Sequence, residues 1–308
     1  MKTLSSAQVK AEAARLGFSA CGLAPAGPLP PARTAAFDRW LAEGRHAGMD
    51  YLGRHAALRG DPRLLVPGAQ TVVSLALAYA PATAPPPGGF RLARYALGLD
   101  YHDVVRLRLR QLMQALGAEG AGRACCDTAP VDERYWAVRC GLGWQGRHTQ
   151  VILPGQGSYF FLGELILTLP ADRYDEPLAD GCGTACRQCL DACPTGAIRG
   201  KGPMDARRCL SYLTIEHRGP LPEGTGRHLG HCFYGCDRCA EACPHNRHAR
   251  PTAVEAFEPR PGLLAMTDAD WRALDIETYR RLFKGSAVKR AKYEGLLRNI
   301  RAALGTEI

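Results

Sequence analysis

Two runs of cysteine are the strongest constraint in this sequence. The first, GCGTACRQCLDACPTGAI, spans residues 181–198, and the second, CFYGCDRCAEACPHN, begins at Cys232. Four thiolates can hold a zinc ion or an iron–sulfur cluster, and zinc ribbons use two CxxC pairs separated by a longer loop. Both runs here end instead in C-x2-C-x3-C-P, as the bacterial two-cluster ferredoxin pattern does. The spacing therefore favours two 4Fe-4S clusters over structural zinc.

The ligands of the two clusters are expected to cross between the runs. In the ferredoxin pattern, the cysteine before proline binds the neighbouring cluster. Cys209 would supply the ligand that the second run lacks. One departure is the gap of three residues between Cys182 and Cys186, which leaves Cys232 as an alternative to Cys182. The expected ligand sets are Cys182, Cys186, Cys189 and Cys243 for one cluster, and Cys193, Cys209, Cys236 and Cys239 for the other.

The remaining cysteines and the composition indicate a globular cytoplasmic protein. The chain has 308 residues, with 46% hydrophobic and 22% charged residues, which is ordinary for a globular fold. Its N-terminus reads as a charged helix rather than a signal peptide, and its apolar runs are shorter than the roughly 20 residues of a membrane span. In the cytoplasm, grouped cysteines usually bind metal or take part in catalysis. The other cysteines, Cys21, Cys125, Cys126 and Cys140, are expected to be buried, and nothing demands more than a monomer.

Apolar patterns divide the chain into an α+β domain, a cysteine-rich section and a helical tail. We expect a helix from Ser6, its cap, to about Leu16, a buried strand at 71–79 and an amphipathic helix at 101–117. A helix is also expected at 37–52. Two apolar runs, 149–154 and 158–169, flank a Gly-Gln-Gly turn and suggest a hairpin or adjacent strands. The expected domains are 1–175, 176–250 and 251–308.

Two further motifs have competing interpretations. GLGWQG, from Gly141 to Gly146, matches a dinucleotide-binding loop, but it follows a helix and opens a strand, which is the reverse of the required order. The net charge of +9 is concentrated in one helix-like segment between Tyr279 and Arg301. That segment is either a solvated face or a surface for a polyanion. Its basic residues are Arg280, Arg281, Lys284, Lys289, Arg290, Lys292, Arg298 and Arg301.

Several blocks, in order along the chain, resemble epoxyqueuosine reductases. They are RYALGLDYHDVV, DTAPVDERYWAVRCGLGWQGRHT, GSYFFLGELIL, CRQCLDACPTGAI, RRCLSYLTIE, GCDRCAEACPHN and KYEGLLRNIRAALG. The resemblance covers nearly the whole chain. It implies a nitroreductase-like first domain that binds cobalamin, followed by a ferredoxin-like domain. It also implies reduction of epoxyqueuosine to queuosine at the wobble position of tRNA with a GUN anticodon, fed by an external flavodoxin or ferredoxin.

The resemblance also implies site residues. Glu133 stands where the family has an acidic proton donor, usually Asp, and is expected to contact cobalamin as well. Asp132 and Asp127 are fallback acids. Further cobalamin contacts are expected at Gly157, Ser158 and Tyr159 in the glycine turn, and, less directly, at Ser211 and Asp237. His102, His148 and His217 are expected to be polar neighbours rather than cobalt ligands.

Other functions remain open from the sequence. A different corrinoid iron–sulfur reductase, similar to reductive dehalogenases, would act on a small molecule and would not need the basic segment. A plain ferredoxin-type carrier would not need the 170 residues before the clusters. A zinc-stabilised RNA-binding protein would be colourless. The electron donor, the cobalt axial ligand and the choice between organocobalt and radical chemistry are not readable from the residues.

Overall fold

A four-stranded antiparallel sheet forms the centre of the first part of the chain. The structure is a computed structural model that describes residues 2–83 and 89–305. The strand order is β1-β2-β7-β4. β2 is buried along almost its whole length, which explains its continuous apolar sequence. The strands are β1 (Ala20–Pro25), β2 (Thr71–Ala78), β4 (Gly122–Cys125) and β7 (Phe160–Leu167).

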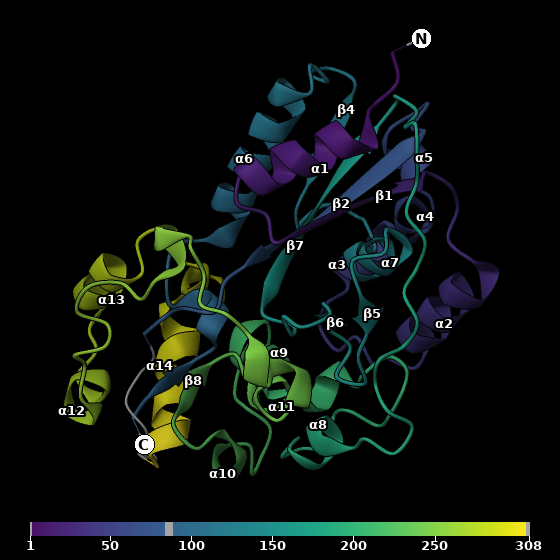
Figure 1. Cartoon of the computed structure of the whole chain (residues 1–308). Helices are drawn as coiled ribbons and strands as arrows, with labels where there is room; N and C mark the ends of the chain where they lie inside the picture. Colours follow the sequence, from purple (N-terminus) through teal and green to yellow (C-terminus); the bar gives the residue numbers. More distant parts are fainter. Residues whose placement is uncertain (1, 84–88, 306–308) are drawn as a thin grey trace.

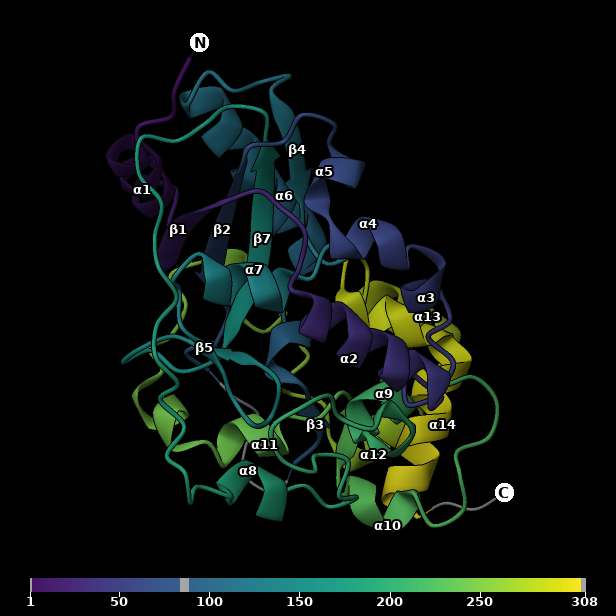
Figure 2. The ribbon, with the colours of Figure 1, turned by 90° about the vertical axis from the view of Figure 1, so that its right-hand side faces the viewer.

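Helices cover both faces of this sheet (Figure 1). α1 (Ser6–Arg15) and α6 (Tyr101–Ala115) pack on one face, where Leu109 and Leu112 are fully buried. α7 (Glu133–Arg139) packs on the other face through Trp136. Four helices lie between β1 and β2 in the chain, on the side that Figure 2 brings to the front. They are α2 (Pro31–Ala42), α3 (Tyr51–Arg54), α4 (Ala56–Gly60) and α5 (Pro62–Leu65).

A second core joins a short early segment to the C-terminal part of the chain. β3 (Arg91–Leu92) pairs in parallel with β8 (Cys232–Tyr234). Phe90 and Phe233 pack there around Trp271, which is fully buried. The expected boundary at residue 175 therefore separates residues that share one core, and the three domain ranges stay a prediction. The C-terminal elements are η4 (Glu255–Phe257), α12 (Asp268–Arg272), α13 (Ile276–Leu282), η5 (Ala287–Ala291) and α14 (Lys292–Leu304).

The cysteine-rich section consists of short helices and loops. α8 (Gln188–Asp191) carries Cys189 and packs against α11 (Arg238–Glu241), which carries Cys239. Both are single turns without a side-chain cap. The other elements near it are η1 (Arg94–Ala96), η2 (Ala206–Arg208), α9 (Leu210–Ile215), α10 (Gly226–Leu229) and η3 (Pro244–His248).

The structure corrects several sequence expectations. Ser5, not Ser6, caps α1, because its hydroxyl accepts the N–H of Gln8. The two apolar runs do not form a hairpin: β6 (Val151–Ile152) pairs with β5 (Trp144–Gln145), while β7 lies between β2 and β4. The helix expected at 37–52 ends at Ala42. The basic segment is also not one helix, since a turn and η5 separate α13 from α14.

The other element expectations hold. The strand at 71–78 and the amphipathic helix at 101–115 form as predicted. Cys125, Cys126 and Cys140 are buried, and Cys21 packs at the edge of the core. GLGWQG follows α7 and contains β5, an arrangement that does not suit a dinucleotide loop. Across residues 2–83 and 89–305, no helix has the length and apolar character needed to cross a membrane.

Candidate functional site

Strand register brings a buried carboxyl group to the centre of the first domain. Glu164 lies in β7, opposite Ser74 of β2 on one side and Cys125 of β4 on the other. Its side chain is inaccessible to solvent. The Ser74 hydroxyl donates a hydrogen bond to Oε1 of Glu164 at 3.1 Å. Oε2 of Glu164 lacks a fixed donor, so this oxygen is suited to carry a proton.

Glu133 lies beside Glu164. Glu133 is the first residue of α7, and its carboxylate accepts the backbone N–H of Asp127. It also forms a hydrogen bond with the Glu164 side chain. Burial, and then the negative charge of Asp127, raises the pKa of Glu133 to about 7. Burial, and then the neighbouring Glu133, raises the pKa of Glu164 well above its ordinary value. The two carboxyls therefore form a pair that holds a proton at neutral pH.

Asp127 lies between the Glu133–Glu164 pair and the protein surface. Nε2 of His102 contacts the Asp127 carboxylate at 3.0 Å, and Nδ1 contacts that of Asp100 at 2.6 Å. Burial opposes the charged imidazole, but these two hydrogen bonds raise the pKa of His102 to about 9. Burial also opposes ionisation of Asp127, yet His102 lowers its pKa. Asp127 is thus an ionised carboxylate with an exposed side chain, 55% accessible.

The second fallback acid, Asp132, has a structural role. Its carboxylate accepts two hydrogen bonds from Arg33, at 2.8 and 2.9 Å, and caps α7 through the N–H of Tyr135. Arg33 belongs to α2, so this ion pair fixes the start of α7 against the neighbouring helix. The Asp132 carboxylate is therefore already occupied by hydrogen bonds. The side chain of the next residue, Glu133, instead lies against the buried Glu164 carboxyl.

An aromatic and a basic side chain lie near the exposed side of Asp127. Tyr51 of α3 is 43% exposed, and the Arg290 guanidinium lies 5.8 Å from the centre of its ring. Arg290 also makes a bidentate ion pair with Glu216, at 2.7 and 2.8 Å. The charges of Glu216, Arg290 and Asp127 all act on the Tyr51 phenol. We call Tyr51, Arg290 and Glu216 the mouth of the carboxyl site.

Packing and electrostatic contacts gather the cysteines into two groups. Cys182 packs with the buried Cys243, and the thiols of Cys182, Cys186 and Cys243 act electrostatically on Cys189. In the same way, Cys193, Cys209 and Cys236 act on Cys239. Cys232 forms a hydrogen bond with Cys236 and so lies with the second group. In the part of the chain described, no three His, Cys, Asp or Glu side chains are close enough to hold a single metal ion.

The expected cobalamin contacts fall in separate places. Gly157, Ser158 and Tyr159 surround Asn246, whose Oδ1 accepts the Ser158 N–H at 2.6 Å. A Cβ on Gly157 would lie 2.1 Å from that Oδ1, so the protein itself fills the space over this glycine. Asp237 accepts the N–H of Arg94 nearby, and burial raises its pKa to about 6. Ser211 lies apart on α9, next to Tyr212, whose hydroxyl accepts the Gly48 N–H.

Sequence reasoning missed Glu164, Tyr51 and Glu216, whereas Arg290 was already part of the predicted basic segment. A carboxyl group inside the apolar run FLGELIL was the available signal for Glu164, because such a residue is rarely buried without a partner. Tyr51 had no such signal, since its contact with Arg290 joins segments more than two hundred residues apart. Burial lowers the pKa of His148 to about 4, so this imidazole is neutral.

Two groups of cysteine thiols, in a chain that also holds a protonated carboxyl pair, define a redox protein of the iron–sulfur class. Comparison with known proteins agrees: the family described as 4Fe-4S double cluster binding domain matches residues 181–246, and that described as epoxyqueuosine reductase QueG, DUF1730, matches residues 59–128. The chain is 40% identical to the epoxyqueuosine reductase of Cellulophaga algicola, over 95% of both chains. It is 41% identical to that of Escherichia coli, over 86% of this chain and 72% of the relative. The chain therefore belongs to the epoxyqueuosine reductase family, a family of oxidoreductases.

Solved structures agree with this family membership. A crystal structure of epoxyqueuosine reductase with an epoxyqueuosine-modified tRNA-Tyr stem loop has a TM-score of 0.89, at 29% identity, and covers 97% of this chain and 80% of its own. A Bacillus subtilis epoxyqueuosine reductase, whose catalytic loop is swung out of the active site, has a TM-score of 0.87 at 28% identity, with the same coverage. The α+β fold and its double-cluster section are thus those of the family.

Proposed function

We propose that this protein reduces the epoxide of epoxyqueuosine in tRNA to the alkene of queuosine. The observation that carries the proposal is Glu133, a half-buried acid whose pKa lies near neutrality beside Glu164, in a chain of the epoxyqueuosine reductase family. The overall change consumes two electrons and two protons, breaks two C–O bonds, forms a C=C bond and releases water. The site must therefore supply both reducing power and an acid.

Glu133 is the proposed proton donor to the departing epoxide oxygen. A general acid works best when its pKa is close to the working pH, and burial brings Glu133 there. Asp127 is ionised and Asp132 is held by Arg33, so neither is equally suited. Glutamate replaces the aspartate usual in the family, and its additional methylene is accommodated by the contact with the Asp127 N–H.

The two cysteine groups are the proposed ligands of the clusters. One set is Cys182, Cys186, Cys189 and Cys243, and the other is Cys193, Cys209, Cys236 and Cys239. The packing of Cys182 with Cys243 supports Cys182 over Cys232 in the first set. Both sets consist only of thiols, which suits iron–sulfur clusters. Their electrons would come from an external one-electron donor of the flavodoxin or ferredoxin type.

Cobalamin is the proposed group that passes these electrons to the substrate. When bound, it supplies a low-valent cobalt that reduces the epoxide. The residues around Glu133 fit such a group, because a proton-bearing carboxyl lies at the half-buried start of α7 and is backed by the buried Glu164 carboxyl. Glu133, Gly157, Ser158 and Tyr159 would hold it, with Ser211 and Asp237 as weaker predicted contacts. The cavity at Tyr159 measures about 200 Å³, below the roughly 300–1,000 Å³ of common ligand sites, so it does not by itself hold a corrin.

The proposed tRNA surface lies around the mouth. Arg290 and Lys289 of η5 are exposed, as are Arg280 and Arg281 of α13. Phosphate contacts supply much of the affinity for RNA. The wobble base must leave its stack to reach a half-buried acid. Tyr51, exposed beside Arg290, offers a flat surface on which a base can stack. Arg298 instead donates to the carbonyls of Leu213, His217 and Gly219 and stabilises the fold.

The test is direct conversion of modified tRNA. Protein reconstituted with iron, sulfide and cobalamin is incubated with epoxyqueuosine-containing tRNA and a chemical reductant, and the nucleosides are analysed by mass spectrometry. The expected product is queuosine, which is one oxygen atom lighter. Retained epoxyqueuosine, in material that carries both clusters and cobalamin, would contradict the proposal and favour a small-molecule substrate.

A further inference from the structure

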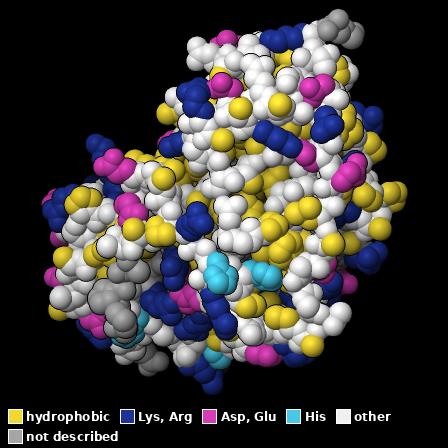
Figure 3. Space-filling model, in the orientation of Figure 1, with side chains coloured by type: hydrophobic (Ala, Val, Ile, Leu, Met, Phe, Trp, Pro, Cys, Tyr) yellow, Lys and Arg dark blue, Asp and Glu magenta, His cyan; other side chains and the backbone are white. Residues whose placement is uncertain are grey.

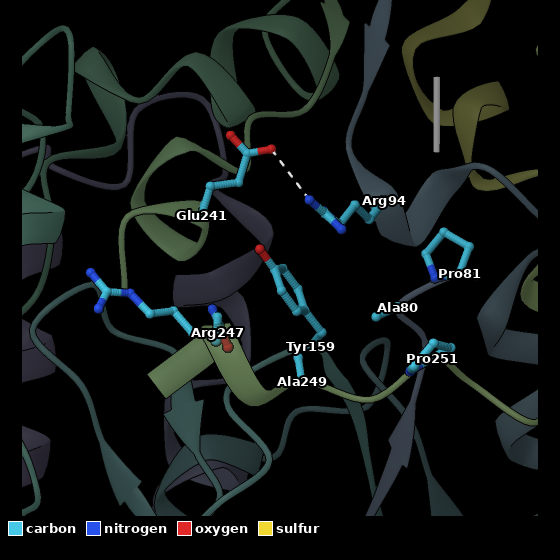
Figure 4. Close-up of a pocket in the computed structure, with 9 residues that line it drawn as sticks. Ala80, Pro81, Arg94, Tyr159, Glu241, Arg247, Ala249 and Pro251 are labelled. Atoms are coloured by element: carbon cyan, nitrogen blue, oxygen red, sulfur yellow. Dashed lines mark ion pairs between the residues drawn. The ribbon is translucent and has the colours of Figure 1, made fainter. Parts of the chain in front are cut away.

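A cavity outside the carboxyl site lies between the end of the central sheet and the cysteine-rich section. It has a volume of about 200 Å³ and is lined by Ala80, Pro81, Arg94, Tyr159, Glu241, Asn246, Arg247, Ala249 and Pro251. Figure 4 shows Tyr159 at its centre, with Arg94 and Arg247 on different sides of the ring. The Arg94 guanidinium lies 5.1 Å from the centre of that ring. The cavity thus has an aromatic side chain at its base and basic side chains at its edges.

The edges of this cavity carry an excess of positive charge. We define the basic rim as Arg91, Arg94, Arg247 and Arg250, of which Arg91, Arg247 and Arg250 are exposed. Glu241 is the carboxylate that faces them, paired with Arg91 and 3.7 Å from Arg94. Asp237 lies beneath, held by the Arg94 N–H. The segment 244–250, PHNRHAR, contains no acid. Figure 3 shows dark blue and cyan side chains gathered over this region, around β3 and α11.

The rim is adjacent to both cysteine groups. α11 carries Cys239 of the second group, and Cys243 of the first group follows directly at its end. Arg247 is four residues beyond Cys243 and lies in η3, the short helix that begins directly after this cysteine. The Cys239 thiol is close enough to act electrostatically on the Tyr159 phenol. Because electron transfer falls off steeply with distance, a redox partner placed over the rim would be close to both groups.

From these contacts we propose that the basic rim is the docking surface for a small acidic one-electron carrier protein, an inference that rests on the proposed function. Complementary charge steers such encounters and speeds association, and its effect weakens as salt is added. Four arginines against Glu241 make the rim complementary to an acidic partner.

The position of the rim favours a protein carrier over tRNA. α11 and α3 lie on different sides of the molecule in Figure 2, with α11 toward the left and α3, which carries Tyr51, toward the right. The rim is therefore separate from the mouth at Tyr51 and Arg290. A carrier could dock on the rim while tRNA occupies the mouth, so reduction would not require release of the substrate.

The test uses the reconstituted protein and oxidised flavodoxin, a carrier of this acidic class. The double variant Arg247→Glu and Arg250→Glu reverses two exposed charges. The matched control, Arg110→Glu and Arg123→Glu, reverses two exposed charges on the first domain. At low salt, calorimetry should show about tenfold weaker flavodoxin binding for the rim variant and unchanged binding for the control. The salt dependence of binding should also decrease in the rim variant alone.

Three further measurements separate docking from the proposed function. With a small chemical reductant, the rim variant should convert epoxyqueuosine tRNA as fast as the unsubstituted protein, whereas reduction of its clusters by flavodoxin should be about tenfold slower. Its affinity for tRNA should be unchanged. Unchanged flavodoxin binding would overturn the docking proposal, and so would a loss of tRNA affinity, which would make the rim an RNA surface. Failure of the unsubstituted protein with the chemical reductant would contradict the proposed function but leave the binding result valid.

Discussion

Glu133 and Glu164 form a hydrogen bond with each other although both are carboxyl groups. Two adjacent carboxylates in a buried setting cannot both be ionised without a large cost, so one proton is retained between them. Ser74 anchors Glu164, and the Asp127 N–H anchors Glu133. The pair is thus anchored at both side chains: Glu164 stays protonated, and Glu133 gains or loses a proton near pH 7, as the proposed reduction requires.

Replacing Glu133 by Gln should abolish turnover while leaving both kinds of cofactor bound. Glutamine keeps the size and the hydrogen bonds of the side chain, but it has no proton to donate. The rate of queuosine formation should fall by about 100-fold or more. Iron, sulfide and cobalt contents should stay unchanged. Full activity in this variant would assign the acid to another residue.

The activity should decrease as the pH rises through about 7. Glu133 acts in its protonated form, and burial together with Asp127 raises its pKa to about 7. The acid is therefore present below this pH and lost above it. Single-turnover rates with pre-reduced enzyme, measured from pH 5.5 to 9, isolate this step from electron supply. A rate that is constant across this range would exclude Glu133 as the titrating donor.

Glu164 should adjust the pKa of Glu133 rather than donate the proton to the substrate itself. Because its raised pKa keeps it protonated, it donates to Glu133 and lowers the pKa of that carboxyl. Glu164→Gln retains a hydrogen-bond donor to Glu133, so the pH above which activity is lost should stay unchanged. Glu164→Leu removes this donor, so the pH above which activity is lost should increase. Identical pH profiles for the two variants would contradict this role, and a thermal melt of each would detect a simple loss of folding.

Cys182 and Cys232 should differ in their effect on the clusters. Cys182 packs against Cys243, whereas Cys232 forms a hydrogen bond with Cys236. Cys182→Ser should therefore lose one cluster, and Cys232→Ser should keep both. Iron and sulfide analysis, with electron paramagnetic resonance of the reduced protein, measures this. The reverse result would place Cys232 in the first ligand set.

Gly157→Ala should destabilise the protein through Asn246. The new Cβ would lie 2.1 Å from Oδ1 of Asn246, and the backbone at Gly157 has a φ of +81°, which L-residues rarely adopt. Together, these effects should cost roughly 1–3 kcal/mol of the free energy of unfolding. Asn246→Ala in the same chain should recover the steric part of the loss. If denaturant unfolding shows no destabilisation in the single variant, the turn is more adaptable than the structure indicates.

Local patterns were sufficient for much of the fold. The period of 3.6 in residues 101–115 and the continuous apolar run at 71–78 each predicted the correct element, because a single segment carries the whole signal. The hairpin prediction was wrong because two neighbouring apolar runs can pair with partners elsewhere. β7 lies between β2 and β4, and no local feature of its sequence specifies those neighbours.

The sequence by itself determined which chemistry the chain can support: the order and spacing of its thiols, and an acid in the block shared with the family. Cysteine spacing is local, so it can be read along the chain. The tertiary structure decided what surrounds each group. It placed Glu164 against Glu133, Cys182 against Cys243 and the rim arginines over the cluster section. These relationships join residues that are distant in sequence, and the pKa values and charge patterns that follow depend on burial and distance, which exist only in the folded chain.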